Sequence, residues 1–150
     1  MSATDTPYVT SNSDSRDRLA ATAASLTDEE LQRTVNGGWT VAAVLAHLAF
    51  YDRFAVARWD QYEREGALLD MPAGLVDLLN TAGAGDWLAV APRRAVELAL
   101  SAAEAIDERI QRLPEAAVEH ALATDRRAMV NRGLHRNSHL DDIDGALRGS

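Results

Sequence analysis

The chain has 150 residues, which is the length of one domain, and its formal net charge of −8 gives an average field that repels phosphate groups and anionic membranes. It contains no cysteine, which excludes disulfides, thiolate metal ligands and a cysteine nucleophile. We therefore expect a single domain over residues 1–150 that binds neither nucleic acid nor a membrane, and any thiol chemistry must use a thiol from outside.

The N-terminal part of the chain does not resemble a targeting segment. Residues 1–15 are polar and contain neither the basic nor the apolar part of a signal peptide. No apolar run is long enough to span a bilayer. We expect a cytoplasmic protein in which residues 1–12 form a flexible N-terminal segment.

Apolar residues recur with the period of a helix in several segments, and strand-like alternation is not evident. A first helix is predicted to begin after Ser13 or Asp14. Residues 27–31 contain a capping-box pattern, which predicts a further short helical turn. The glycine pair at 37–38 ends it.

A long second helix follows, with Thr40 as its predicted N-cap, and it continues past Trp59. Residues 66–90 contain Pro72, four glycines and short apolar clusters. This composition predicts an extended connection with one or two helical turns.

The third predicted helix starts near Pro92 and ends at Pro114. After a connecting stretch, Thr124 is predicted to cap a fourth helix that runs to about Leu147. Four substantial helices, of which two are joined by a long connection, predict an all-α four-helix bundle with a long crossover.

The last predicted helix contains the sequence HRNSH, which places His135 and His139 one turn apart on the same face. In the second helix, His47 shares a face with Val44 and Tyr51. Three imidazoles from two helices can meet in the core, where neutral nitrogen ligands suit zinc, nickel or copper and leave one coordination position open. The alternative is that each is an ordinary core or boundary residue satisfied by a hydrogen bond.

Two stretches carry a resemblance to a known family. SLTDEELQRTVNGGWTVAAVLAHLAFYDR, residues 25–53, resembles the N-terminal half of DinB-like proteins, especially the mycothiol-dependent maleylpyruvate isomerase branch, through its W-T-V and A-H-L elements. NRGLHRNSHLDDIDGAL, residues 131–147, is similar to the last helix of that superfamily. The resemblance implies a DinB-like four-helix bundle and a divalent metal, zinc before nickel, held by His47, His135 and His139. The mycothiol-dependent isomerases carry a carboxylate at the position of His135, whereas the broader DinB-like set carries histidine there.

A divalent ion with three imidazole ligands and an open position lowers the pKa of bound water or binds an incoming thiol as its thiolate. The resemblance to thiol-dependent enzymes favours a metal-dependent thiol S-transferase or isomerase that uses mycothiol or bacillithiol on a small electrophile. A metal-dependent hydrolase and a metal- or small-ligand-binding protein without turnover are the alternatives. No general base, oxyanion hole or phosphate loop is identifiable, so no catalytic residue is predicted. The resemblance allows a homodimer, because DinB-like relatives are often dimers, but the sequence itself does not determine the oligomeric state.

Four further side chains are candidates for supporting such a site or its substrate. Tyr51 is either a hydrogen-bonding group or a core aromatic, and Asp142 can orient an imidazole. Arg132 and Arg136 flank the first histidine of HRNSH and can attract a carboxylate-bearing substrate. The more common role for such arginines is solubility or pairing with an acid such as Asp141.

Overall fold

A computed structural model describes residues 7–149 of the chain. Within this range the chain is helical, and the β contact found there is an isolated bridge between Thr34 and Thr40. In chain order the elements are α1 (Pro7–Ser25), α2 (Asp28–Leu31), the short 3-10 turn η2 (Asn36–Gly38), α3 (Val41–Glu65), α4 (Leu75–Ala89), α5 (Pro92–Gln111), α6 (Glu115–Ala123), the 3-10 turn η3 (Arg127–Met129) and α7 (Gly133–Arg148).

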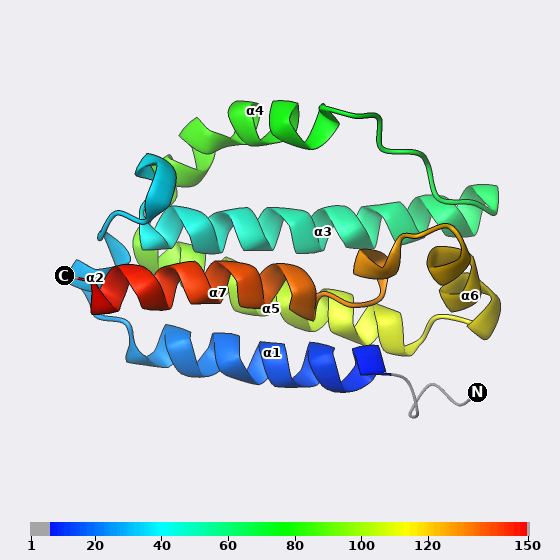
Figure 1. Ribbon diagram of the computed structural model, residues 1–150, viewed down its shortest axis with the longest axis horizontal. Coiled ribbons are helices and arrows are strands. Elements are labelled where there is room, and N and C mark those ends of the chain that lie inside the picture. Colours follow the sequence, from blue (N-terminus) through cyan, green and yellow to red (C-terminus); the bar gives the residue numbers. More distant parts are fainter. Residues whose placement is uncertain (1–6, 150) are drawn as a thin grey trace.

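Helices α1, α3, α5 and α7 form a four-helix bundle (Figure 1). Helix α3 packs along α5, and α7 packs along α1. Helix α4 packs against α3 on the side away from α1 and makes up most of the long connection between α3 and α5 (Figure 1). The predicted all-α bundle with a long crossover is therefore confirmed. No helix within residues 7–149 combines the length and the apolar composition needed to cross a bilayer.

The predicted start of the central helix is also confirmed. Gly37 and Gly38 have φ angles of 83° and 85°, a left-handed conformation that glycine adopts without strain and that ends the preceding turn. The Thr40 hydroxyl then accepts a hydrogen bond from the Ala43 amide at 3.1 Å, which caps α3. Residues 41–49 are all buried, so the first half of α3 is covered on every side.

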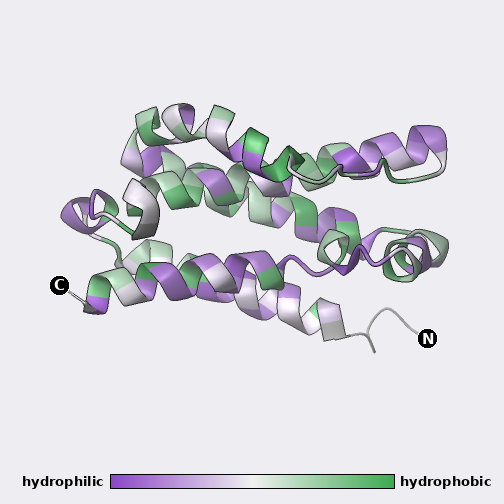
Figure 2. Ribbon diagram, turned by 45° about the horizontal axis from the view of Figure 1, so that its top comes forward, coloured by the Kyte–Doolittle hydropathy of each residue, from purple (hydrophilic) through white to green (hydrophobic). Residues whose placement is uncertain are grey.

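Figure 2 shows hydrophobic and hydrophilic residues alternating around the helices. The apolar faces of the four bundle helices meet in one core, to which α1 contributes Leu19, α3 Leu45, α5 Ala103 and α7 Leu140. A second apolar cluster surrounds Trp59 at the far end of α3, where the indole donates a hydrogen bond to the Met129 carbonyl at 3.0 Å. Both halves of α3 therefore contribute to an apolar cluster.

The first helix begins earlier than predicted. It starts at Pro7 instead of after Ser13 or Asp14, so the expectation of a flexible segment is wrong for residues 7–12, while residues 1–6 lie outside the described part. The reason is a tertiary contact, because the Asn12 amide donates to the Val130 carbonyl at 2.8 Å and accepts from the Arg132 backbone N–H at 2.7 Å. A polar sequence is thus held in a helix by polar partners.

The prediction of an extended connection over residues 66–90 is wrong, because this stretch contains the full helix α4. Glycine in this helix allows close packing and does not end the helix. A Cβ added to Gly83 would clash with the indole ring of Trp87, one turn further along the same helix. Trp87 is buried against α3, and the missing side chain makes room for it.

The last helix starts later than predicted. Thr124 does not cap it, because Thr124 lies at the C-terminal end of α6 and its hydroxyl donates to the His120 carbonyl at 2.7 Å. Asp125 has a left-handed φ of 58°, which turns the chain away from the axis of α6. The chain then passes through η3 before α7 begins at Gly133.

Two buried arginines, one immediately before α7 and one in its first turn, are paired with two buried aspartates of the neighbouring helices. Arg136 is fully buried and donates two parallel hydrogen bonds to Asp107 of α5, at 2.9 and 2.8 Å. A longer bond of 3.4 Å reaches Asp52 of α3, which also accepts from Arg132 Nε at 2.9 Å. The two positive and two negative charges balance inside the bundle, as buried charges require.

Replacing Arg136 with methionine should lower the free energy of unfolding by about 3–5 kcal/mol, because Asp107 would remain buried with only a long contact of 3.4 Å to the partly exposed Arg16. Urea unfolding measures this loss. Arg18→Met is the matched control, because Arg18 pairs with the more exposed Asp141 and Asp144 at 2.8 and 2.9 Å, and its loss should cost less than about 1 kcal/mol. Equal losses in the two variants would contradict the assigned role of the buried pair.

Gly83→Ala should displace the Trp87 indole and lower the free energy of unfolding by about 1–3 kcal/mol, the usual cost of overpacking. Gly85 lies in the same helix, and a Cβ there would meet nothing within 4 Å. Gly85→Ala should therefore stabilise the helix by up to about 1 kcal/mol. Thermal unfolding of the two variants would show opposite shifts, and shifts of the same sign would refute the packing argument.

Candidate metal centre

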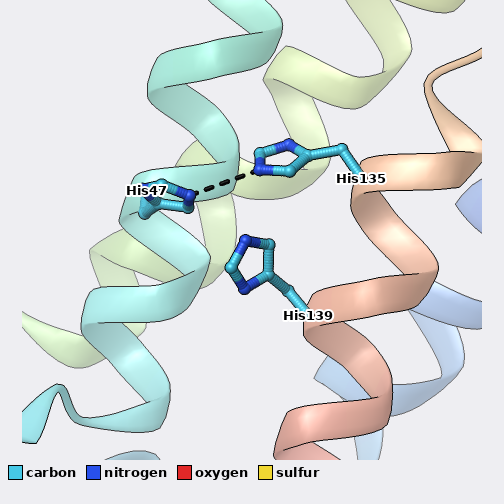
Figure 3. Close-up of side chains that lie close together, drawn as sticks. All are labelled: His47, His135 and His139. Atoms are coloured by element: carbon cyan, nitrogen blue, oxygen red, sulfur yellow. Dashed lines mark hydrogen bonds between the residues drawn. The ribbon is translucent and has the colours of Figure 1, made fainter. Parts of the chain in front are cut away.

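The three candidate histidines come from two helices that face each other. His47 lies in the buried first half of α3, and His135 and His139 lie one turn apart on α7. Figure 3 shows the three rings pointing toward one another across the space between these helices. One ring nitrogen of each histidine can be chosen so that all three lie within 4.8 Å of one another. The structure therefore brings together the residues that the sequence singled out.

The distance between two of these rings has the dimension of a metal site. His47 Nε2 and His135 Nε2 are 3.3 Å apart. Two nitrogens bound to zinc at about 2.0–2.1 Å with a tetrahedral angle are separated by roughly 3.3 Å. The same distance also allows a long N–H···N hydrogen bond in which one of the two rings donates. The donor set thus fits a divalent metal, with three neutral nitrogens and room for a further ligand.

The surroundings keep these imidazoles uncharged. Burial, with a smaller contribution from His139, lowers the pKa of His47 from 6.5 to about 4. Burial and then the positive charge of Arg132 lower the pKa of His135 from 6.5 to about 2. For His139, burial lowers the pKa and outweighs the opposing effect of Asp142. At neutral pH all three rings therefore have a lone pair available for a metal.

The ring of His47 is positioned by aromatic packing. Its centroid lies 5.0 Å from that of Trp39, 4.9 Å from that of Trp87 and 4.9 Å from that of Tyr51. Its Nδ1 atom is buried and has no hydrogen-bond partner among the described residues. Ligating histidines usually donate this second nitrogen to an oxygen. Here the orientation of the imidazole comes from its fit between aromatic rings.

Two of the predicted supporting residues lie next to the histidines. The Tyr51 hydroxyl donates to Asn80 Oδ1 of α4 at 2.6 Å, and its ring centroid lies 5.7 Å from that of His135. Tyr51 therefore links α4 to the site. The Asp142 carboxylate lies 3.9 Å from His139 Nδ1, which is too far for a direct hydrogen bond but close enough to act on its charge.

The two arginines, Arg132 and Arg136, lie inside the bundle and not on its surface. The expected pairing with an acid is found, but the acids are Asp52 and Asp107, whereas Asp141 pairs with Arg18. The expectation of a solubility role is wrong, because both arginines are buried. Arg136 lies within the ion-pair network between α3, α5 and α7 and does not line the pocket beside the histidines. Arg132 does line that pocket while it also pairs with an aspartate of α3.

A pocket of about 520 Å³ opens beside the three histidines, which form part of its wall. Its other lining residues are mainly apolar, and several were not predicted: Trp39, Phe54, Ala55, Arg58, Met71, Val76, Asn80, Arg126, Ala128 and Met129. Val76 and Asn80 were missed because α4 was not expected. Arg58 had a usable signal, because helical spacing places it on the same face of α3 as His47 and Tyr51.

Acid should destabilise the metal-free protein through these histidines. In the unfolded chain these histidines have a pKa near 6.5, whereas in the folded protein the pKa of His47 is about 4 and that of His135 about 2. Stability is therefore present above about pH 6.5 and is lost as the pH falls below it, by about 1.4 kcal/mol per pH unit for each histidine. Urea unfolding with a chelator should show this slope in the wild type and a shallower one in His135→Gln. A slope that is identical in the two proteins would exclude His135 as its source.

Comparison with known proteins agrees with this arrangement. The family model described as the DinB superfamily matches residues 12–138, which include His47 and His135 and end one residue before His139. Neither the search of curated proteins nor the search of solved structures gave a match. Because the family model spans most of the sequence and the fold is the all-α bundle expected for it, the chain belongs to the DinB superfamily.

Proposed function

We propose that this DinB-superfamily protein is a metal-dependent thiol S-transferase or isomerase that joins an external low-molecular-weight thiol to a small electrophile. The observation that carries the proposal is a group of three neutral imidazoles in the wall of a pocket of about 520 Å³. Three protein ligands leave a divalent ion a position for an incoming group. A pocket of this volume accommodates a small molecule beside that position.

His47, His135 and His139 would hold the ion, with zinc expected before nickel. The bound ion supplies a Lewis acid that keeps a thiol deprotonated near neutral pH. The absence of cysteine from the chain means that the reacting sulfur comes from a co-substrate such as mycothiol or bacillithiol. In this proposal the ion activates the thiol, and the protein only has to hold the ion and both reactants.

The chain's own residues would orient the reactants and limit the access of water. Apolar side chains, including Phe54 and Val76, cover much of the pocket wall and favour a weakly hydrated thiolate over water. Burial raises the pKa of Tyr51, so its hydroxyl stays protonated at neutral pH. Because that hydroxyl donates to Asn80, its oxygen can still accept a hydrogen bond from a ligand.

The same observations weigh against the two alternatives. Metal-dependent hydrolases of the zinc-protease type use a glutamate as general base, and no aspartate or glutamate is among the described residues that line this pocket. A purely structural metal site is normally closed by four protein ligands. Three histidines beside an open pocket favour an exchangeable ligand, which a catalytic metal site requires.

Metal content tests the basis of the proposal. Protein purified without a tag or added metal should contain close to one divalent ion per chain, and His139→Ala should lose it. His120→Ala is the matched control, because His120 lies on α6, accepts a bond from the Leu68 amide at 3.4 Å and is not part of the three-histidine group. Elemental analysis of the three proteins decides the matter, and equal metal content in both variants would refute the assigned ligands.

Activity is tested with the metal-loaded protein, monochlorobimane as a fluorogenic electrophile, and mycothiol, bacillithiol or coenzyme A as the thiol. With one of the thiols, the rate of adduct formation should exceed the uncatalysed rate by at least about a hundredfold. This is a small acceleration for an enzyme. His47→Ala and chelator treatment should each abolish that excess. Full metal occupancy without acceleration by any thiol would favour a binding protein without turnover.

A further inference from the structure

Three arginines line the pocket that contains the histidines. They are Arg58 of α3, Arg126 in the segment after α6, and Arg132 immediately before α7. No aspartate or glutamate is among the described residues of the same lining. In a chain with a formal net charge of −8, this concentration of positive charge in one pocket is a local feature and does not follow from composition.

The three guanidinium groups differ in how far protein carboxylates neutralise them. Arg132 pairs with the buried Asp52 at 2.9 Å. Arg126 pairs with Asp70, whose side chain is 94% exposed and therefore compensates it weakly. Arg58 makes no ion pair with any described residue, and its hydrogen bonds go to neutral acceptors, the Leu69 carbonyl at 2.8 Å and Met129 Sδ at 3.2 Å. Arg58 is thus the uncompensated charge of the pocket.

The positive charges act on one another. Burial lowers the pKa of Arg58, and the neighbouring Arg126 and Arg132 lower it further. Like charges held together at low solvent exposure raise the free energy of the empty pocket. An anion between Arg58 and Arg126 would relieve this repulsion, and the planar guanidinium fork matches a carboxylate or a phosphate.

The positions along α3 indicate where this anion would lie relative to the histidines. Arg58 follows His47 by about three helical turns on the same face, an axial rise of roughly 16 Å. Tyr51, Phe54 and Ala55 lie between them and also line the pocket. The pocket therefore has His47 toward one end of this face, a largely apolar middle, and Arg58 toward the other.

We propose that Arg58 and Arg126 form an anion subsite that binds a carboxylate at the far end of the substrate from its reacting atom. The substrate class is then an elongated small molecule with an apolar middle, one anionic terminus and a thiol or electrophilic carbon at the other end. The role of the reacting end rests on the proposed function. The anion subsite rests on the arginines themselves.

The experiment measures the binding of glutarate, adipate and suberate, and of their neutral diamides, to the metal-loaded full-length protein by isothermal titration calorimetry. At least one diacid should bind wild type at least about tenfold more tightly than its diamide, the value of one charged hydrogen bond. Arg58→Gln should reduce diacid affinity about tenfold and leave diamide affinity unchanged. Arg126→Gln provides a second variant, and its wild-type-like circular dichroism would verify folding.

Arg53→Gln is the matched control, because Arg53 is exposed on the same helix, contacts Ser101 at 3.1 Å and does not line the pocket. It should bind the diacids as the wild type does. Diacid affinity that is unchanged in both Arg58→Gln and Arg126→Gln, or reduced equally in Arg53→Gln, would overturn the subsite. Hexyl phosphate included in the same series identifies the anion, because tighter, Arg58-dependent binding of this probe would keep the subsite and assign it to phosphate.

The outcome can be separated from that of the proposed function. Metal content is measured in every variant, and Arg58→Gln should keep its metal because Arg58 is not part of the three-histidine group. If the protein binds metal but Arg58→Gln leaves diacid affinity unchanged, the subsite alone is refuted. Metal-free wild type whose diacid affinity depends on Arg58 would refute the metal-dependent function and leave the subsite in place.

Discussion

The buried pairing of α7 with α3 and α5 is the constraint on which the rest of the molecule depends. Arg132, immediately before α7, and Arg136, in its first turn, share Asp52, while Arg136 also binds Asp107 in a bidentate pair. These four buried charges fix both the rotation of α7 about its axis and its position along that axis. Any rotation or shift would separate a buried charge from its partner, which costs several kcal/mol. His135, next to Arg136 in the sequence, is then turned toward His47 and the pocket. The ion pairs thus position the candidate metal ligands without being ligands themselves.

The crossover helix completes the pocket from the other side. Helix α4 is joined to α3 by the bond between Tyr51 and Asn80, and its Trp87 packs edge-on against the ring of His47. Gly83 permits that packing by leaving space for the indole. A connection without these contacts would leave the histidines open to bulk water, which would raise their pKa values and weaken their preference for the neutral, ligating form. The contacts of α4 with α3 therefore help to keep the histidines in the neutral, ligating form.

Features that depend on residues close together in the sequence were predicted correctly. Features that depend on contacts between residues far apart in the sequence were missed. The cap at Thr40 and the shared face of His135 and His139 depend on residues a few positions apart, and the structure contains both arrangements. The start of α1, by contrast, depends on an asparagine that bonds residues near 130, and Arg132 finds its acid on α3. Sequence proximity suggested Asp141 as a partner instead. Helix α4 was missed because glycine was taken as a breaker where it serves packing.

The charge arrangement around the histidines favours one kind of incoming ligand. Arg132 lowers the pKa of His135, and the same positive charge would stabilise an anion bound at the open position of a metal there. Thiolate and hydroxide are both anions, but hydroxide depends more strongly on hydration, and much of the pocket wall is apolar. Positive charge close to the ligands combined with apolar walls therefore selects for a large, polarisable anion. Sulfur meets this requirement better than oxygen, and the proposal of thiol transfer rests in part on this difference.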